Sequence, residues 1–162
     1  MKTNNTQQGF TLIELVAVIV LLGVLAVTAL PRFMDLGGDA RQAVMESLQG
    51  SLQGASIQVY AKALIQDSLA RTDTVDDNGT LIDTRYGYPM ANGVANNDIE
   101  NLIDLQSNVS GIIWQDGGGS RRRVGYDTDG DGRVTDDGCY MQYNNSTGEG
   151  VQPEIEPNLN NC

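Results

Sequence analysis

The sequence predicts an α+β fold, in which one long helix is followed by a small antiparallel sheet. Apolar residues dominate and then recur at three- and four-residue steps from about residue 10 to about residue 69. A helix is the structure that both patterns favour. After Ala70, short strand-like runs alternate with turn residues. Such a sheet must bury one face, and the apolar stripe of the helix offers the surface for it.

The expected helix begins with an apolar run over residues 10–30, in which only Thr11, Glu14 and Thr28 carry polar side chains. As a helix, about 21 residues at about 1.5 Å each span about 31 Å, close to the thickness of a bilayer core. We therefore expect this segment to cross a membrane. A carboxylate inside such a helix costs about 2.5–3.5 kcal/mol on insertion scales, so Glu14 is a functional candidate.

The residues that precede the apolar run carry a single charge, on Lys2. A secretory signal places its small-residue cleavage site after the apolar run. Here the small residue, Gly9, precedes the run. Cleavage after Gly9 would remove residues 1–9 and keep the helix. It would also leave the new ammonium group of Phe10 four residues before Glu14.

Residues 9–15, Gly-Phe-Thr-Leu-Ile-Glu-Leu, resemble the prepilin signature of type IV pilins and type II secretion pseudopilins. The resemblance implies that a prepilin peptidase cuts after Gly9 and methylates Phe10. It also implies that Glu14 pairs with the N-terminal amine of a neighbouring subunit during filament assembly. The implied pilin fold has a helix whose apolar half protrudes and whose amphipathic half packs on the sheet. An ordinary membrane anchor with a stray Glu is the alternative.

We expect a leader peptide over residues 1–9, a transmembrane or filament-core helix over 10–31, and a globular body over 32–162. Gly23 and Pro31 both weaken a helix, by about 1 and 3 kcal/mol relative to alanine in its interior. The resemblance implies that the segment between these two residues loses helical form when the subunit leaves the bilayer. A plain kink at Pro31 is the milder interpretation.

The body should begin with the amphipathic part of the helix. Its predicted apolar stripe consists of Ala40, Val44, Leu48, Leu52, Ala55, Val59 and Ala63. Gly37 and Gly38 could break the helix locally. Strands are predicted over 80–86, 111–114, 122–126 and 139–143, with a short helix over 97–105 that Asn96 or Asn97 would cap. Residues 71–80 are predicted to form a loop, and residues 144–161 an irregular tail.

Cys139 and Cys162 are the only cysteines. An exported chain with two cysteines favours one disulfide, which would contribute about 3 kcal/mol through loop closure. Two free thiols are the alternative. The resemblance adds that a C-terminal disulfide bounds a variable loop in type IV pilins, and these cysteines match that pattern.

Carboxylates alternate before a glycine in the sequence Asp-Thr-Asp-Gly-Asp-Gly that ends at Gly132, as in the opening of an EF-hand-like calcium loop. The rest departs from that pattern, because Gly138 stands where a bidentate Glu would close the shell. The candidate calcium ligands are Asp127, Asp129, Asp131, the carbonyl of Arg133, Asp136 and Asp137. A solvated acidic turn is the alternative. Calcium is the one cofactor that the sequence suggests.

Composition argues against two classes of function. The net charge of −11 disfavours nucleic-acid binding, which requires basic patches. The tripeptide Arg121-Arg122-Arg123 reads as a solvated turn or as a charge partner for acidic neighbours. The chain has no His, which is the commonest general base. We therefore expect a protein that is not an enzyme.

Within the pilins, the chain is most similar to mannose-sensitive haemagglutinin (MSHA) pilins. The similarity rests on residues 26–29, 35–36, 38–41 and 86–89, the last being Tyr-Gly-Tyr-Pro. It implies a subunit that is held first in the bacterial inner membrane and then polymerises with copies of itself into an extracellular pilus for adhesion and motility. The implied partners are the prepilin peptidase, inner-membrane assembly machinery and an outer-membrane secretin. The sequence does not identify the surface ligand.

Two alternatives stay open. A type II secretion pseudopilin would form a short periplasmic piston, and the acidic loop that starts at Asp127 favours it. A membrane-anchored calcium-binding module that never polymerises is the second. The position of Gly9 before the apolar run argues against that module, because a simple anchor needs no such cleavage.

Overall fold

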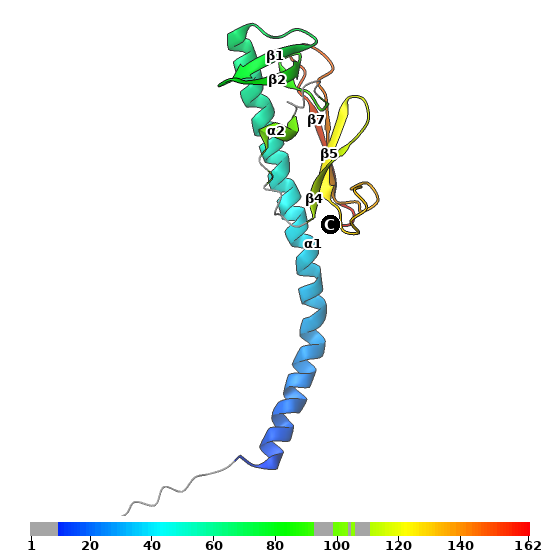
Figure 1. The fold of residues 1–162 in the computed structure, drawn as a ribbon. Coiled ribbons are helices and arrows are strands. Elements are labelled where there is room, and N and C mark those ends of the chain that lie inside the picture. The colour runs from blue at the N-terminus through cyan, green and yellow to red at the C-terminus, as the bar shows by residue number, and fades with distance from the viewer. Residues whose placement is uncertain (1–9, 93–98, 104, 106–110) are drawn as a thin grey trace, which may run out of the picture. The chain divides into compact units, whose positions relative to one another are not determined.

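The computed structural model describes residues 10–92, 99–103, 105 and 111–162 (Figure 1). One helix, α1 (Leu12–Gln66), precedes two antiparallel sheets and a short helix, α2 (Ile99–Leu102). The predicted α+β fold class is therefore confirmed. The predicted helix over 97–105 is confirmed only in part, since α2 is shorter, and its proposed caps at Asn96 and Asn97 lie outside the described residues.

The chain divides into two compact units between Gly38 and Asp39, and α1 contributes residues to both. In the first unit the large apolar side chains between residues 10 and 27 are exposed, with Phe10 at 92%, Val16 at 42% and Val27 at 76%. Among the residues that the structure describes, no helix combines the length and the apolar character that crossing a membrane requires.

Helix α1 continues through Gly23 and Pro31, and also through Gly37 and Gly38. The structure therefore shows no interruption of the helix at these residues. A proline removes one backbone hydrogen bond and a glycine costs about 1 kcal/mol, but helical turns on both sides propagate at little further cost. A loss of helical form between Gly23 and Pro31 on assembly stays a prediction.

Helix α1 ends three residues earlier than predicted, and its C-terminal cap explains why. Asp67 adopts a left-handed conformation with φ of 57°, and the Ser68 N–H donates to the Ala63 carbonyl at 2.9 Å. This geometry satisfies a terminal carbonyl in the manner of a Schellman motif. The left-handed residue at position 67 turns the chain away from the helix axis.

The first sheet has the order β1-β2-β3, formed by β1 (Asp73–Asp77), β2 (Thr80–Arg85) and β3 (Tyr88–Pro89). Strand β2 was predicted, whereas β1 lies where a loop was expected. Asn78 and Gly79 both have positive φ and join β1 to β2 as a tight hairpin. The prediction of a loop was wrong. The residues of β1 are mostly polar, but the Asn-Gly turn pairs them with β2 as a strand.

The second sheet has the order β4-β5-β6-β7 and contains β4 (Ile112–Asp116), β5 (Arg121–Tyr126), β6 (Tyr140–Asn144) and β7 (Glu154–Asn158). The first three strands match their predicted positions within two residues. The prediction of an irregular tail over 144–161 was wrong, because β7 pairs with β6. Strand β7 contains Pro157, which an edge strand tolerates.

The amphipathic part of α1 packs on the sheets, as predicted. Leu48, Leu52, Val59 and Ala63 are buried, whereas Ala40 and Val44 are exposed. The core around α1 and the second sheet contains Met45, Leu48, Leu52, Ala91, Ile99, Val124, Cys139, Met141 and Tyr143. A smaller cluster contains Val59, Ala63, Val75 and Ile82. Met45 replaces Val44 in the buried stripe because Met45, Leu52 and Val59 follow one another at intervals of two helical turns, whereas Val44 lies to one side of this line.

The two sheets are also joined by hydrogen bonds in the core. The Tyr143 hydroxyl in β6 donates to the Pro89 carbonyl in β3 at 2.7 Å. The Ala91 N–H donates to the Asn145 side-chain carbonyl at 2.5 Å. Buried polar groups of this kind stabilise a fold when each has its partner. These contacts connect segments that are about 54 residues apart.

Candidate functional site

The N-terminal candidate residues lie around the first turn of α1. Gly9 is outside the described residues, and Phe10 is exposed. The Thr11 N–H and hydroxyl each donate to Glu14 Oε2 at 2.8 Å, and the Glu14 N–H donates to Thr11 Oγ1 at 3.4 Å. This reciprocal arrangement is a capping box, which satisfies helix N-terminal donors. Glu14 therefore has a structural role within its own chain.

The capping role of Glu14 was missed from the sequence. The spacing of Thr11 and Glu14 fits the Thr-x-x-Glu pattern that precedes an apolar helix, and that pattern could have shown it. A carboxylate in the first turn is also favoured by the helix dipole. The pairing of Glu14 with the amine of a neighbouring Phe10, and the processing at Gly9 and Phe10, stay predictions.

At the other end of the chain, Cys139 and Cys162 form a disulfide, as predicted. Cys139 is buried in the core beside the second sheet. Arg41 in α1 donates from Nε to the Cys162 backbone oxygen at 2.5 Å. The C-terminal residue is therefore held covalently to the body of the sheet and by a hydrogen bond to the helix.

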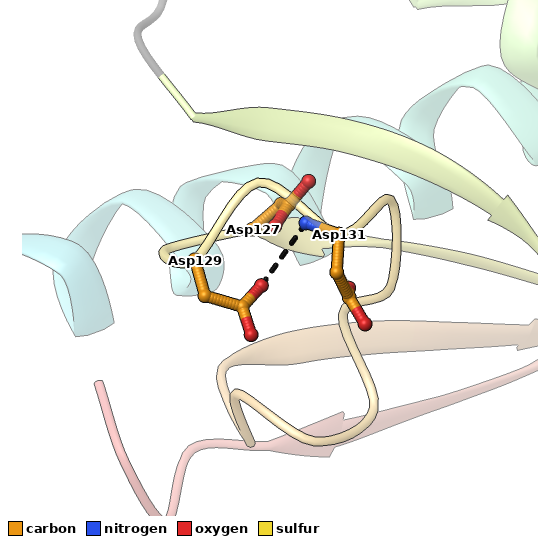
Figure 2. A group of neighbouring side chains, drawn as sticks. All are labelled: Asp127, Asp129 and Asp131. Atoms are coloured by element: carbon orange, nitrogen blue, oxygen red, sulfur yellow. Dashed lines mark hydrogen bonds between the residues drawn. The ribbon is translucent and has the colours of Figure 1, made fainter.

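The acidic loop after β5 brings Asp127, Asp129 and Asp131 together, as Figure 2 shows. One carboxylate oxygen from each side chain lies within 4.8 Å of the others. Asp127 accepts hydrogen bonds from the N–H groups of Gly130 at 2.7 Å and Gly132 at 3.0 Å. These bonds shape the turn and point the three carboxylates toward a common region, where one cation could be shared.

The other predicted calcium ligands are placed differently. Asp136 and Asp137 do not belong to the group of three carboxylates that share this region. Asp137 instead accepts hydrogen bonds from the backbone N–H and hydroxyl of Thr128. The Arg133 N–H donates to the Asp131 carboxylate at 2.8 Å. Calcium binding stays a prediction, with Asp127, Asp129 and Asp131 as its best-placed ligands.

Repulsion within this loop is reflected in the pKa of Asp129. The hydrogen bond from the Asp131 backbone N–H lowers it, but desolvation and the negative charges of Asp131, Asp137 and Asp136 together outweigh that bond. The pKa of Asp129 therefore lies above its usual value. A cation held by the three carboxylates would relieve this repulsion, which is the electrostatic reason to test for one.

The arginine run in β5 mainly pairs with neighbouring polar groups. Arg122 forms an ion pair with Glu100 of α2. Arg123 donates from Nε to the Gln142 side chain at 2.9 Å, and its guanidinium lies 6.0 Å from the centroid of the Tyr140 ring. For Arg122 the interpretation as a charge partner is therefore confirmed.

Comparison with known proteins shows that the chain is similar to type IV pilins. Residues 4–30 match the family described as the prokaryotic N-terminal methylation motif. The chain is 44% identical over 59 residues to a type IV narrow pilus major component of Thermus thermophilus, a match that covers 36% of this chain and 47% of that protein. No solved structure matches the chain.

Two further relatives have related descriptions. A type IV major pilin protein of Myxococcus xanthus is 26% identical over 111 residues, which cover 67% of this chain and 48% of that protein. A fimbrial protein of Eikenella corrodens is 40% identical over 55 residues, which cover 34% of this chain and 36% of that protein. The matches thus span about half or less of each relative's length.

The methylation motif, these relatives, the α+β fold and the C-terminal disulfide together support the type IV pilin family for this chain. The predicted resemblance at this level is therefore confirmed. None of the three relatives is described as an MSHA pilin. The finer similarity to MSHA pilins stays a prediction.

Proposed function

We propose that this chain is a structural subunit of a type IV pilus, which polymerises with copies of itself into an extracellular filament. One observation carries the proposal. A segment that matches the N-terminal methylation motif exposes its large apolar side chains, including Leu12, Ile19 and Leu21. Removing a Val, Leu or Ile side chain from water contributes about 1.5–3 kcal/mol, so this surface strongly favours an apolar environment.

Lipid and the helices of neighbouring copies are the two environments that can cover the apolar surface in turn. In our proposal, residues 10–31 first hold the subunit in the inner membrane and then enter a filament core. Repeated head-to-tail contacts produce open filaments rather than closed rings. The prepilin peptidase, the inner-membrane assembly machinery and the outer-membrane secretin are the partners that such a route requires.

Glu14 would set the axial register of the filament by pairing with the N-terminal amine of a neighbouring Phe10. A carboxylate buried among apolar helices is costly alone and acceptable when paired. The capping box supports this role, because Thr11 already fixes the orientation of the Glu14 carboxylate in the isolated chain. A neighbour in the wrong register would leave the charge of Glu14 unpaired.

Adhesion, as in MSHA-like pili, is the purpose that we propose for the filament, with motility as a further role. The globular body, and especially the segment from Cys139 to Cys162, would provide the contact surface. We propose no catalytic activity, in keeping with relatives described as pilus and fimbrial components. A type II secretion pseudopilin is the second candidate. It is favoured by the acidic loop, in which the carboxylates of Asp127, Asp129 and Asp131 converge.

The variants Glu14→Val and Glu14→Gln test the proposed register. Glutamine keeps an oxygen that can accept the Thr11 hydrogen bonds, whereas valine removes the charge and the cap together. Removing one partner of a buried ion pair costs about 3–5 kcal/mol, so both variants should reduce filament yield at least tenfold. The yield of sheared filaments is measured by electron microscopy and immunoblotting.

The monomer provides the control for both variants. Its disulfide and circular dichroism should match those of the wild type, because Glu14 is exposed and far in sequence from the core. Normal yield from Glu14→Gln with loss in Glu14→Val would assign Glu14 to helix capping alone. Normal yield from both would contradict any role of Glu14 in assembly.

A further inference from the structure

A pocket of about 380 Å³ lies near the C-terminal end of α1. Its walls come from three parts of the chain: the last turns of α1 and the residues just after it, with Tyr60, Asp67 and Leu69, the β2–β3 turn with Tyr86, and the β6–β7 loop with Glu149. The volume falls within the usual range of small-ligand sites. None of these residues belongs to the processing motif, the disulfide or the acidic loop.

The backbone at Tyr86 is strained in a way that places the residue in the pocket wall. Its φ is 53°, a conformation that costs a bulky residue about 1–3 kcal/mol. The Tyr86 N–H donates to the Ala70 carbonyl at 2.9 Å. The next residue, Gly87, has φ of 81°, and a Cβ there would lie 2.7 Å from Leu69 Cδ2. Close packing around Gly87 therefore enforces the turn that holds Tyr86 in place.

Aromatic rings form a second, rigid part of the wall. The Tyr60 ring stacks on the Tyr88 ring, with centroids 4.3 Å apart and an interplanar angle of 7°. Tyr88 is buried, so this contact fixes the orientation of Tyr60. The face of a tyrosine ring is electron-rich and attracts cations. The pocket thus contains the Tyr60 ring, which Tyr88 holds in place, and a second tyrosine, Tyr86, whose backbone is held by the turn.

Two carboxylates complete the wall. Within the described part of the chain, the side chains of Asp67 and Glu149 make no hydrogen bond or ion pair, and no Lys or Arg lines the pocket. Arg85 precedes Tyr86 in sequence, but its Nη1 donates to the Ser120 hydroxyl at 3.3 Å. The pocket therefore combines two negative charges with aromatic and aliphatic surface.

We propose that this pocket binds an organic ammonium cation. Carboxylates attract the charge, the tyrosine rings in the wall can add cation–π attraction, and Leu69 offers apolar surface for the carbon substituents. An anion would be repelled by Asp67 and Glu149. A hard metal ion would gain nothing from the two rings and Leu69, because it requires oxygen ligands on most sides. The inference does not depend on polymerisation.

Choline and its neutral carbon isostere, dimethylbutanol, form a matched pair of probes for the full chain in a nonionic detergent. Binding is followed by nuclear magnetic resonance through the amide signals of Ala70, Glu149 and Gly150. We expect saturable shifts with choline and binding at least about tenfold weaker with dimethylbutanol. Lysine is a second probe. Tighter binding of lysine than of choline would indicate that the ligand is a primary amine on a protein, and tighter binding of choline would indicate a quaternary ammonium compound.

Three variants locate the interaction. Glu149→Gln should weaken choline binding about two- to fivefold, and Tyr86→Leu should weaken it further, whereas Tyr86→Phe, which retains a ring, should leave it nearly unchanged. Glu154→Gln, which changes an exposed carboxylate outside the pocket, is the control. Circular dichroism verifies that each variant folds. Any of three results would overturn the proposal. The first is that neither choline nor lysine binds saturably, and the second is that dimethylbutanol binds as tightly as choline. The third is that Glu149→Gln has no effect on binding in a folded chain.

Discussion

The two units of the chain differ in the burial of their apolar side chains. In the unit that ends at Gly38, leucine, isoleucine and valine side chains up to Val27 are exposed. In the unit that begins at Asp39, leucines such as Leu52 are fully buried against the sheets. The second unit contains the core that stabilises its own fold. The first unit exposes an apolar surface whose removal from water would be favourable, and this difference is the structural basis of the proposed function.

Breaking the disulfide should have a large effect on the second unit. The variant Cys139→Ser with Cys162→Ser should lose about 2–5 kcal/mol of unfolding free energy, since the crosslink restricts the unfolded chain. Thermal and denaturant unfolding of the full chain in detergent would measure this. Wild-type protein treated with a reductant should show the same loss. Unchanged stability in both samples would contradict a stabilising role of the disulfide.

Two leucine-to-alanine variants compare the units directly. Leu52→Ala removes a side chain that is 0% exposed and should destabilise the body by about 2–5 kcal/mol. Leu21→Ala removes one that is 64% exposed and should change unfolding by less than about 0.5 kcal/mol, while lowering filament yield. Denaturant unfolding and filament yield are measured for both. If Leu21→Ala destabilised the body as much as Leu52→Ala, the contrast between the units would be wrong.

Calcium should have a moderate effect, confined to the second unit. If the loop binds calcium, a concentration of 100 times Kd raises the unfolding free energy by about 2.7 kcal/mol. Asp129→Asn should remove most of this gain, and the exposed carboxylate variant Asp39→Asn should retain it. Thermal unfolding with calcium, magnesium or a chelator provides the measurement. Equal unfolding temperatures in calcium and chelator would contradict the calcium prediction.

Acid should produce the smallest effect, at Asp116. The Gly118 N–H, then the Asn92 side chain and the charges of Arg122 and Arg123, hold the pKa of Asp116 below its usual value. A carboxylate with a depressed folded pKa contributes stability above its unfolded pKa, about 3.9, and loses it as pH falls through the folded pKa.

The variant Asp116→Asn isolates this charge, because asparagine retains an oxygen for the Gly118 N–H. The variant should have a slightly lower unfolding temperature at about pH 6, and the difference from wild type should disappear by about pH 2. A difference that stayed constant across this range would assign the effect to packing rather than to the charge of Asp116.

Periodicity predicted the main elements of the fold because it reports directly on burial. The helical repeat through Leu48 and Leu52 indicated the face of α1 that packs on the sheets. Strand β1 was missed because its ladder depends on a hairpin turn at Asn78 and Gly79, whereas its composition is polar. Strand β7 was missed because pairing with β6 overrides the poor strand propensity around Pro157.

Candidate sites were predictable where a motif is local in sequence. Alternation alone indicated that Asp127, Asp129 and Asp131 converge, and the two cysteines indicated the disulfide. The pocket with Tyr60 and Glu149 was not predictable, because its walls come from segments that only the tertiary fold brings together. The contact of Arg41 with the Cys162 backbone is of the same kind, since it joins residues 121 positions apart.

Electron microscopy of sheared surface material, combined with the intact mass of the subunit, would distinguish a pilus subunit from the alternatives. We expect long filaments made of a chain that begins at methylated Phe10 and contains the disulfide. A processed chain without surface filaments would favour the pseudopilin. A chain that still begins at Met1 and forms no filaments would contradict the account.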